Sequence, residues 1–141
     1  MTPADLAALH AVCFLTPRPW SAAEFVALTG RADTFLLTES QGFLLGRVVA
    51  GEAELLTLAV APVARRQGTA RRLLARFQAE AMARSAETAF LEVSAANAPA
   101  RALYATAGWA EAGLRRGYYR RPEGGAEDAL ILTLDLPATT L

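Results

Sequence analysis

The chain has 141 residues, 53% of them hydrophobic, and its 14 basic residues, all arginines, balance its 14 acidic residues to a formal net charge of zero. This length suits one domain, at about 100–200 residues per domain, and we expect a single domain over residues 1–141. No apolar run reaches the roughly 20 residues of a membrane span, and zero net charge disfavours bulk attraction to nucleic acid or to a membrane surface.

The cysteine content and the N-terminal segment indicate the compartment. The single cysteine, Cys13, excludes an internal disulfide and fits a reducing compartment. The segment MTPADLAALHAVCF has no basic cluster, unlike a secretory signal. We therefore expect a cytoplasmic protein. One histidine and one cysteine cannot build a zinc site, so we expect no metal.

The first half of the chain predicts two helices and three strands. Thr2 can cap a helix over residues 3–14, and Ser21 with Glu24 forms a capping box for a helix over residues 20–30. Strand-like runs follow, and the short turns between them predict an antiparallel meander. These runs cover residues 34–39, 42–50 and 53–60.

The second half predicts a helix, a strand, a helix and a terminal hairpin. The helix over residues 69–86 carries an apolar stripe at helical spacing, formed by Ala70, Leu73, Leu74, Phe77 and Ala81. A strand over residues 88–95 and a helix over residues 97–108 follow. Two strands, at residues 109–116 and 128–136, flank a loop at residues 117–125. The order of elements predicts a mixed, mostly antiparallel α/β sheet flanked by helices.

The segment VARRQGTARRLL places one glycine among four arginines at the start of a predicted helix. A helix start offers unpaired N–H groups that favour an anion, and Gly68 lets the backbone curl and a ligand oxygen approach. These features suit a pyrophosphate; the alternative is an ordinary solvated helix start. The Gly-Lys-Ser/Thr ending of a nucleotide-triphosphate loop is missing.

Two residues are candidates for proton transfer. Glu92 lies inside a predicted interior strand, where an unpaired carboxylate is costly, so it is either a general base or a solvated residue at an open edge. Tyr104 shares one helix face with Asn97, and it is either a core tyrosine or an acid for a leaving thiolate. His10 and Cys13 lie close together but lack a third group, so a core cysteine is the favoured interpretation.

Residues Arg65–Ala70 read RRQGTA and fit the (Gln/Arg)-x-x-Gly-x-(Gly/Ala) motif of the GCN5-related N-acetyltransferase (GNAT) family. The chain resembles this family from Asp5 onward, in PWS, LAVAP, LEV, NAPARALYATAGW, RRGYY and the later ED at Glu127-Asp128. The resemblance implies the GNAT fold, with acetyl-CoA as co-substrate. It also implies a sheet that opens between the strand of Leu55–Val60 and that of Thr88–Ala95.

The resemblance implies roles for individual residues. Glu92 would be the general base and Tyr104 the general acid. Acetyl-CoA would be bound by Leu58, Ala59, Val60, Arg66, Gln67, Gly68, Thr69, Ala70, Arg71 and Asn97. The acceptor groove would contain Trp20, Tyr118 and Tyr119.

The acceptor implied by the resemblance is the N-terminal alanine of a small-subunit ribosomal protein. An α-amine with a pKa of about 8 loses its proton more easily than a lysine at about 10.4, so one carboxylate is a sufficient base for direct attack in a ternary complex. An internal lysine, a polyamine or a small-molecule amine remains the alternative acceptor. A non-catalytic CoA-binding module is a further alternative, and the oligomeric state stays open.

Three departures from the family pattern concern the sheet edge and the acceptor region. Because a helix is predicted from Pro3, we expect the family's first strand to be missing. Ser94 stands where members that acetylate ribosomal proteins have an arginine, and Gly117 stands where they have an asparagine. The last two positions lie near the expected acceptor site.

Overall fold

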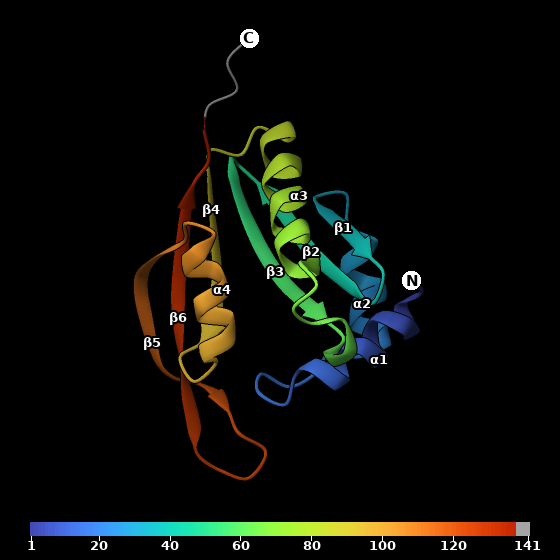
Figure 1. The fold of residues 1–141 in the computed structure, drawn as a ribbon, viewed down its shortest axis with the longest axis vertical. Helices are drawn as coiled ribbons and strands as arrows, with labels where there is room; N and C mark the ends of the chain where they lie inside the picture. The colour runs from blue at the N-terminus through green and yellow to red at the C-terminus, as the bar shows by residue number, and fades with distance from the viewer. Residues whose placement is uncertain (138–141) are drawn as a thin grey trace.

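Six strands and four α-helices form one mixed α/β sheet structure in a computed structural model that describes residues 1–137 (Figure 1). The α-helices are α1 (Pro3–Cys13), α2 (Ala22–Thr29), α3 (Thr69–Ala83) and α4 (Ala98–Thr106), and η1 (Pro62–Ala64) is a short 3-10 helix. The strands are β1 (Thr34–Glu39), β2 (Gly42–Val49), β3 (Glu52–Val60), β4 (Thr88–Ser94), β5 (Ala110–Arg120) and β6 (Ala126–Asp135). Their order across the sheet is β1-β2-β3-β4-β6-β5.

Helices α1 and α2 begin after the predicted N-cap residues Thr2 and Ser21, and the structure adds a capping box at Thr2 to the one predicted at Ser21. The Thr2 hydroxyl accepts a hydrogen bond from the Asp5 N–H at 3.1 Å, and the Asp5 carboxylate accepts one from the Thr2 N–H at 2.8 Å. Ser21 and Glu24 make the same reciprocal pair at the start of α2. These bonds satisfy backbone donors that a helix start leaves unpaired. The Ser21 box also fixes the end of the α1–α2 connection where α2 begins.

Helices cover both faces of the sheet. A larger core packs α3 and α4 against one face, and it includes Phe77, Leu91 and Trp109. A smaller core packs α1 and α2 against the other face, around Leu6 and Phe25. Figure 1 shows α3 and α4 on the side of the sheet nearer the viewer.

A β-bulge in β3 changes which face its side chains take. The antiparallel register with β2 pairs Leu45 with Thr57 but Gly46 with Leu55, so Leu56 has no partner residue. An extra residue of this kind places two neighbouring side chains on one face. Leu55 therefore packs in the larger core, whereas Leu56 packs against the smaller core and Thr57 contacts α1.

The sheet opens between β3 and β4, as predicted. These strands are parallel, and they pair only through Glu52–Glu54 of β3 and Thr88–Phe90 of β4. Beyond this short ladder, β3 pairs only with β2, and β4 pairs only with β6. The facing edges of Leu55–Val60 and Leu91–Ser94 thus keep backbone groups that no strand pairs.

Predicted boundaries of β5, α3 and β6 are wrong, and β6 begins at Ala126 rather than at residue 128. The segment Gly117–Arg120, expected as a loop, continues β5. Tyr119 and Arg120 pair with β6 after an irregularity in the register. At this irregularity the Asp128 carboxylate accepts a hydrogen bond from the Gly117 N–H at 2.8 Å. Helix α3 ends at Ala83 rather than at residue 86. The backbone turns left-handed at Ser85, with a φ of 65°, and the Ala86 N–H donates back to the Ala81 carbonyl.

The sheet has β1 at one edge and β5 at the other. Within residues 1–137, the first element is α1 and the first strand is β1. Over the same residues, no helix has both the length and the apolar character needed to cross a bilayer.

Candidate active site

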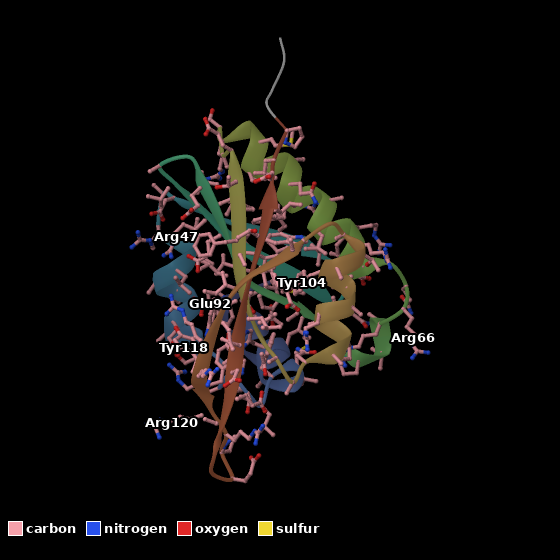
Figure 2. All side chains as sticks on the ribbon, turned by 90° about the vertical axis from the view of Figure 1, so that its left-hand side faces the viewer. Arg47, Arg66, Glu92, Tyr104, Tyr118 and Arg120 are labelled. Atoms are coloured by element: carbon pink, nitrogen blue, oxygen red, sulfur yellow. The ribbon has the colours of Figure 1, made fainter. Side chains whose placement is uncertain are left out.

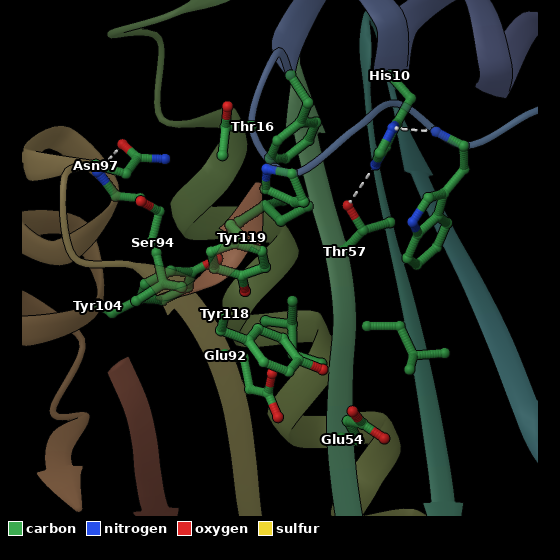
Figure 3. A pocket seen from close by; sticks show the side chains of 18 residues that line it. His10, Thr16, Glu54, Thr57, Glu92, Ser94, Asn97, Tyr104, Tyr118 and Tyr119 are labelled. Carbon is green, nitrogen blue, oxygen red and sulfur yellow. Dashed lines mark hydrogen bonds between the residues drawn. The ribbon is translucent and has the colours of Figure 1, made fainter. Parts of the chain in front are cut away.

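A pocket of about 360 Å³ lies where β3 and β4 separate (Figure 3). Its walls come from α1, the α1–α2 connection, β3, β4, α4 and β5, so segments far apart in the sequence meet there. Seven of the residues predicted for catalysis or binding line it: Trp20, Leu58, Glu92, Asn97, Tyr104, Tyr118 and Tyr119.

Glu92 enters the pocket from β4. Its neighbours Leu91 and Val93 are buried in the larger core, so the alternation of the strand turns Glu92 to the opposite face. The Glu92 side chain is 22% exposed to solvent, and one of its carboxylate oxygens lies 3.6 Å from the guanidinium of Arg115 on β5. Glu92 is therefore only partly buried and has a cationic neighbour, in contrast to the unpaired interior carboxylate that the sequence suggested.

Tyr104 closes the pocket from α4. Its side chain is 7% exposed and packs edge-to-face against Trp109, with ring centroids 6.0 Å apart. Burial raises the pKa of the phenol above its ordinary value of 10, so the hydroxyl keeps its proton at neutral pH. The phenol therefore carries a proton, although burial makes it a weaker acid than an exposed tyrosine.

Asn97 caps α4 and also lines the pocket. Its side-chain oxygen accepts a hydrogen bond from the Ala100 N–H at 3.2 Å, which is typical of an N-cap residue. This use of the oxygen leaves the side-chain NH₂ to donate, and Figure 3 shows the amide turned into the pocket. The residue can thus hold a carbonyl of a bound molecule.

The loop before α3 forms a separate hollow of about 160 Å³, lined in part by Arg66, Gly68, Ala70 and Arg71. Arg66 and Gly68 have φ angles of 64° and 79°, which curl the backbone so that successive N–H groups converge. Gly68 is the N-cap of α3 and provides no side-chain cap. The first N–H groups of α3 are therefore open to an anion such as a pyrophosphate.

The arginines near this loop divide into two groups. Arg72 and Arg76 bind the Glu39 carboxylate at 2.8 and 2.9 Å, which ties α3 to β1. Within residues 1–137, Arg66 and Arg71 make no such ion pair, and both line the hollow. The charge that can face a phosphate therefore comes from this second group.

Two residues predicted for the cofactor do not present side chains to either cavity. The Gln67 amide donates to the Val63 carbonyl at 3.4 Å, and Ala59 is buried in the smaller core. Only their backbone groups remain for binding. Figure 2 shows Arg66 on one side of the molecule and Glu92 with Tyr118 on the other, with Tyr104 between them.

His10 lines the pocket, and the sequence interpretation missed its role. The Trp20 N–H donates to His10 Nδ1 at 3.1 Å, so Nε2 carries the proton and donates to Thr57 Oγ1 at 3.0 Å. Burial lowers the pKa of His10 from 6.5 to about 4. The available signal was its position four residues after Leu6, on the buried side of the first helix. Cys13 packs against the smaller core, as predicted.

Comparison with known proteins identifies the family. Residues 7–109 match the acetyltransferase (GNAT) family. Over 122 residues the chain is 41% identical to the [ribosomal protein bS18]-alanine N-acetyltransferase of Escherichia coli K12, covering 84% of this chain and 82% of that protein. The Haemophilus ducreyi protein of the same name is 33% identical, with 84% of each chain covered.

The fold agrees with that match. The crystal structure of the ribosomal-protein-S18-alanine N-acetyltransferase from E. coli superimposes with a TM-score of 0.80 and 36% identity, covering 96% of this chain and 90% of that one. Its similarity extends beyond the matched family region into the terminal hairpin. The chain belongs to the acetyltransferase (GNAT) family and is an acetyl-CoA-dependent N-acetyltransferase.

Proposed function

We propose that this enzyme acetylates the N-terminal α-amine of alanine on a small-subunit ribosomal protein of the bS18 type. The observation that carries the proposal is the 41% identity, over 84% of the chain, to an enzyme named for that reaction. We propose further that residues 1–141 act as one N-acetyltransferase domain in the cytoplasm. The reducing environment suits the single thiol of Cys13.

Acetyl-CoA binding is assigned to the edge of β3 and to the loop before α3. Beyond its short ladder with β4, the edge of β3 at Leu58, Ala59 and Val60 has no strand on its open side within residues 1–137, which supports hydrogen bonding to the amides of the pantetheine arm. The N–H groups from Arg66 to Arg71, with Gln67, Gly68, Thr69 and Ala70 between them, support binding of the pyrophosphate. Asn97 donates its free amide on the pantetheine side.

Proton transfer is assigned to Glu92 and Tyr104. The α-nitrogen attacks the thioester carbon, so a C–N bond forms and the C–S bond breaks. Glu92 takes the proton that the amine releases, and the Tyr104 hydroxyl gives its proton to the leaving sulfur. The location of Glu92 on the α1–α2 face of the sheet and the location of Tyr104 on α4, where its side chain lines the same pocket, support this division of roles.

The acceptor is assigned to the groove between Trp20 and the β5–β6 hairpin. Tyr118 and Tyr119 are packed edge-to-face, with centroids 5.2 Å apart, and both line the pocket. The hairpin is fixed to β4 because the Ser94 hydroxyl donates to the Glu127 carboxylate. Gly117 has a φ of 60°, a conformation that asparagine also tolerates, so this departure from the family pattern preserves the backbone path.

A single assay tests the acceptor. The enzyme is incubated with acetyl-CoA and a peptide that has a free N-terminal alanine, the following sequence of its own S18 protein and an internal lysine. Fragmentation in a mass spectrometer then locates the acetyl group. We expect it on the α-nitrogen; transfer to lysine alone would overturn the proposed acceptor and leave the acetyltransferase assignment intact.

The general base is tested with two carboxylate variants of the same pocket. We expect Glu92→Gln to lower kcat by about 10²–10⁴-fold near neutral pH, the usual contribution of a general base. Glu54→Gln is the matched control, because Glu54 lines the opposite wall and is bound to Arg47 at 2.6 Å. Equal losses in the two variants would contradict the assignment of Glu92, since any negative charge would then have the same effect.

A further inference from the structure

Thr57 is a buried residue of the pocket wall that no step above uses. It is 7% exposed and lies on β3 at the bulge, and its Oγ1 accepts the hydrogen bond from His10 Nε2 (Figure 3). The direction of that bond follows from the other nitrogen: a His10 ring protonated at Nδ1 could not accept the Trp20 N–H. Thr57 is therefore the acceptor, and it keeps its own hydroxyl proton.

This hydroxyl proton has no acceptor within residues 1–137. Two other buried hydroxyls do donate: Thr34 to the Leu28 carbonyl at 2.6 Å, and Ser94 to the Glu127 carboxylate. Buried Thr69 resembles Thr57, since it accepts from Arg72 without donating to any described residue, but it lies outside this pocket. A buried donor without an acceptor is unfavourable and rare in folded proteins. Because Thr57 lines a pocket, a bound molecule can supply the missing acceptor.

The bulge determines which molecule Thr57 faces. Leu58 points to the larger core, and Val60 lines the hollow beside the phosphate loop, so this face of β3 belongs to the cofactor side. Thr57 points to the α1–α2 face, and Glu92 on β4 turns to that same face. The Thr57 hydroxyl thus lies on the side where the amine meets its base.

We propose that the Thr57 hydroxyl, oriented by His10, donates a hydrogen bond to the first peptide carbonyl oxygen of the acceptor. The inference rests on the proposed function, because it requires an N-terminal peptide amine. In such an acceptor a carbonyl lies next to the carbon that bears the amine, whereas a lysine side chain has only methylene groups there. Thr57 is therefore a specificity residue that favours α-amines, and His10 is its positioning residue.

The test combines one variant with one change in the peptide. The alanine peptide is compared with an analogue in which a trans-alkene replaces the first peptide bond, which removes the carbonyl and keeps the shape. For the wild-type enzyme, the alkene is expected to lower the acceptor kcat/KM by about threefold to tenfold, as for one neutral hydrogen bond. Thr57→Val is expected to lower kcat/KM for the natural peptide by the same factor. In this variant, replacing the natural peptide with the alkene analogue is expected to cause no further loss.

Two controls separate a direct contact from a structural effect. Thr57→Ser keeps the hydroxyl and is expected to restore the dependence on the carbonyl. Thr34→Val removes a buried hydroxyl away from the pocket, and its dependence on the carbonyl is expected to equal that of the wild type. Additive losses in Thr57→Val and the alkene would overturn the inference. Wild-type enzyme that acetylates only lysine would overturn the proposed function and this inference together.

Discussion

The phosphate loop makes a quantitative prediction for Gly68→Ala. Gly68 has a φ of +79°, and a Cβ there would lie 3.2 Å from Nη1 of Arg72, the flexible end of a side chain. A non-glycine residue in this conformation costs roughly 1–2 kcal/mol. We expect the midpoint of thermal unfolding to fall by about 2–8 °C, and the domain to stay folded at 25 °C.

Binding of acetyl-CoA is expected to fall further than stability explains. The added methyl group stands beside the N–H groups that converge at the start of α3, where a phosphate oxygen must approach closely. Loss of one charge-assisted hydrogen bond, worth about 1.5–3 kcal/mol, weakens binding by about 10- to 150-fold. Isothermal titration calorimetry measures this change, and kcat at saturating acetyl-CoA is expected to change much less.

Gly51→Ala is the matched control. Gly51 has a φ of +80° in the β2–β3 turn, and a Cβ there would meet nothing within 4 Å. It therefore carries the same conformational cost without a ligand nearby. If Gly68→Ala and Gly51→Ala bound acetyl-CoA with equal affinity, the phosphate cradle at Gly68 would be refuted.

Two further predictions concern the hairpin and the buried histidine. Gly117→Asn is expected to change the midpoint of thermal unfolding by less than about 3 °C. Asparagine tolerates the φ of 60° at this position, and the new Cβ would lie 3.8 Å from the Ala126 Cβ. A fall of more than about 8 °C, as for a strained residue, would contradict this expectation. His10, with a pKa of about 4 in the folded protein and 6.5 as its ordinary value, contributes stability above pH 6.5 that is lost as the pH falls toward 4. The free energy of unfolding, measured with urea across this pH range, is expected to change with pH less steeply in His10→Asn than in the wild type, by about 1 kcal/mol per pH unit. Parallel plots of this free energy against pH for the two proteins would refute the prediction.

Local sequence signals predicted most of the elements. The capping boxes at Thr2 and Ser21 involve residues three apart, so they act before any tertiary contact forms. The apolar stripe of α3 likewise needed only helical spacing, and Leu73, Leu74 and Phe77 are buried as it predicts. The ends of β5 and α3 were predicted less well, because they depend on Asp128 and on a left-handed turn at Ser85.

The site shows the same division between local and distant causes. The motif around Gly68 is contiguous, so the proposal of a phosphate-binding loop there needs only neighbouring residues. His10 and Thr57 are 47 positions apart, and nothing in either neighbourhood predicts their hydrogen bond. The ion pair of Glu92 with Arg115 arises because β6 lies between β4 and β5, an order that only the folded sheet defines.

The sequence alone therefore determined the helices, the meander, the acetyl-CoA motif and the family resemblance, since each depends on residues close together in the chain. The tertiary structure decided the rest. It set how far β3 and β4 stay paired, which face Thr57 takes after the bulge, and how exposed Glu92 remains. These features depend on packing and hydrogen bonds between distant segments, whose free energies no local pattern encodes.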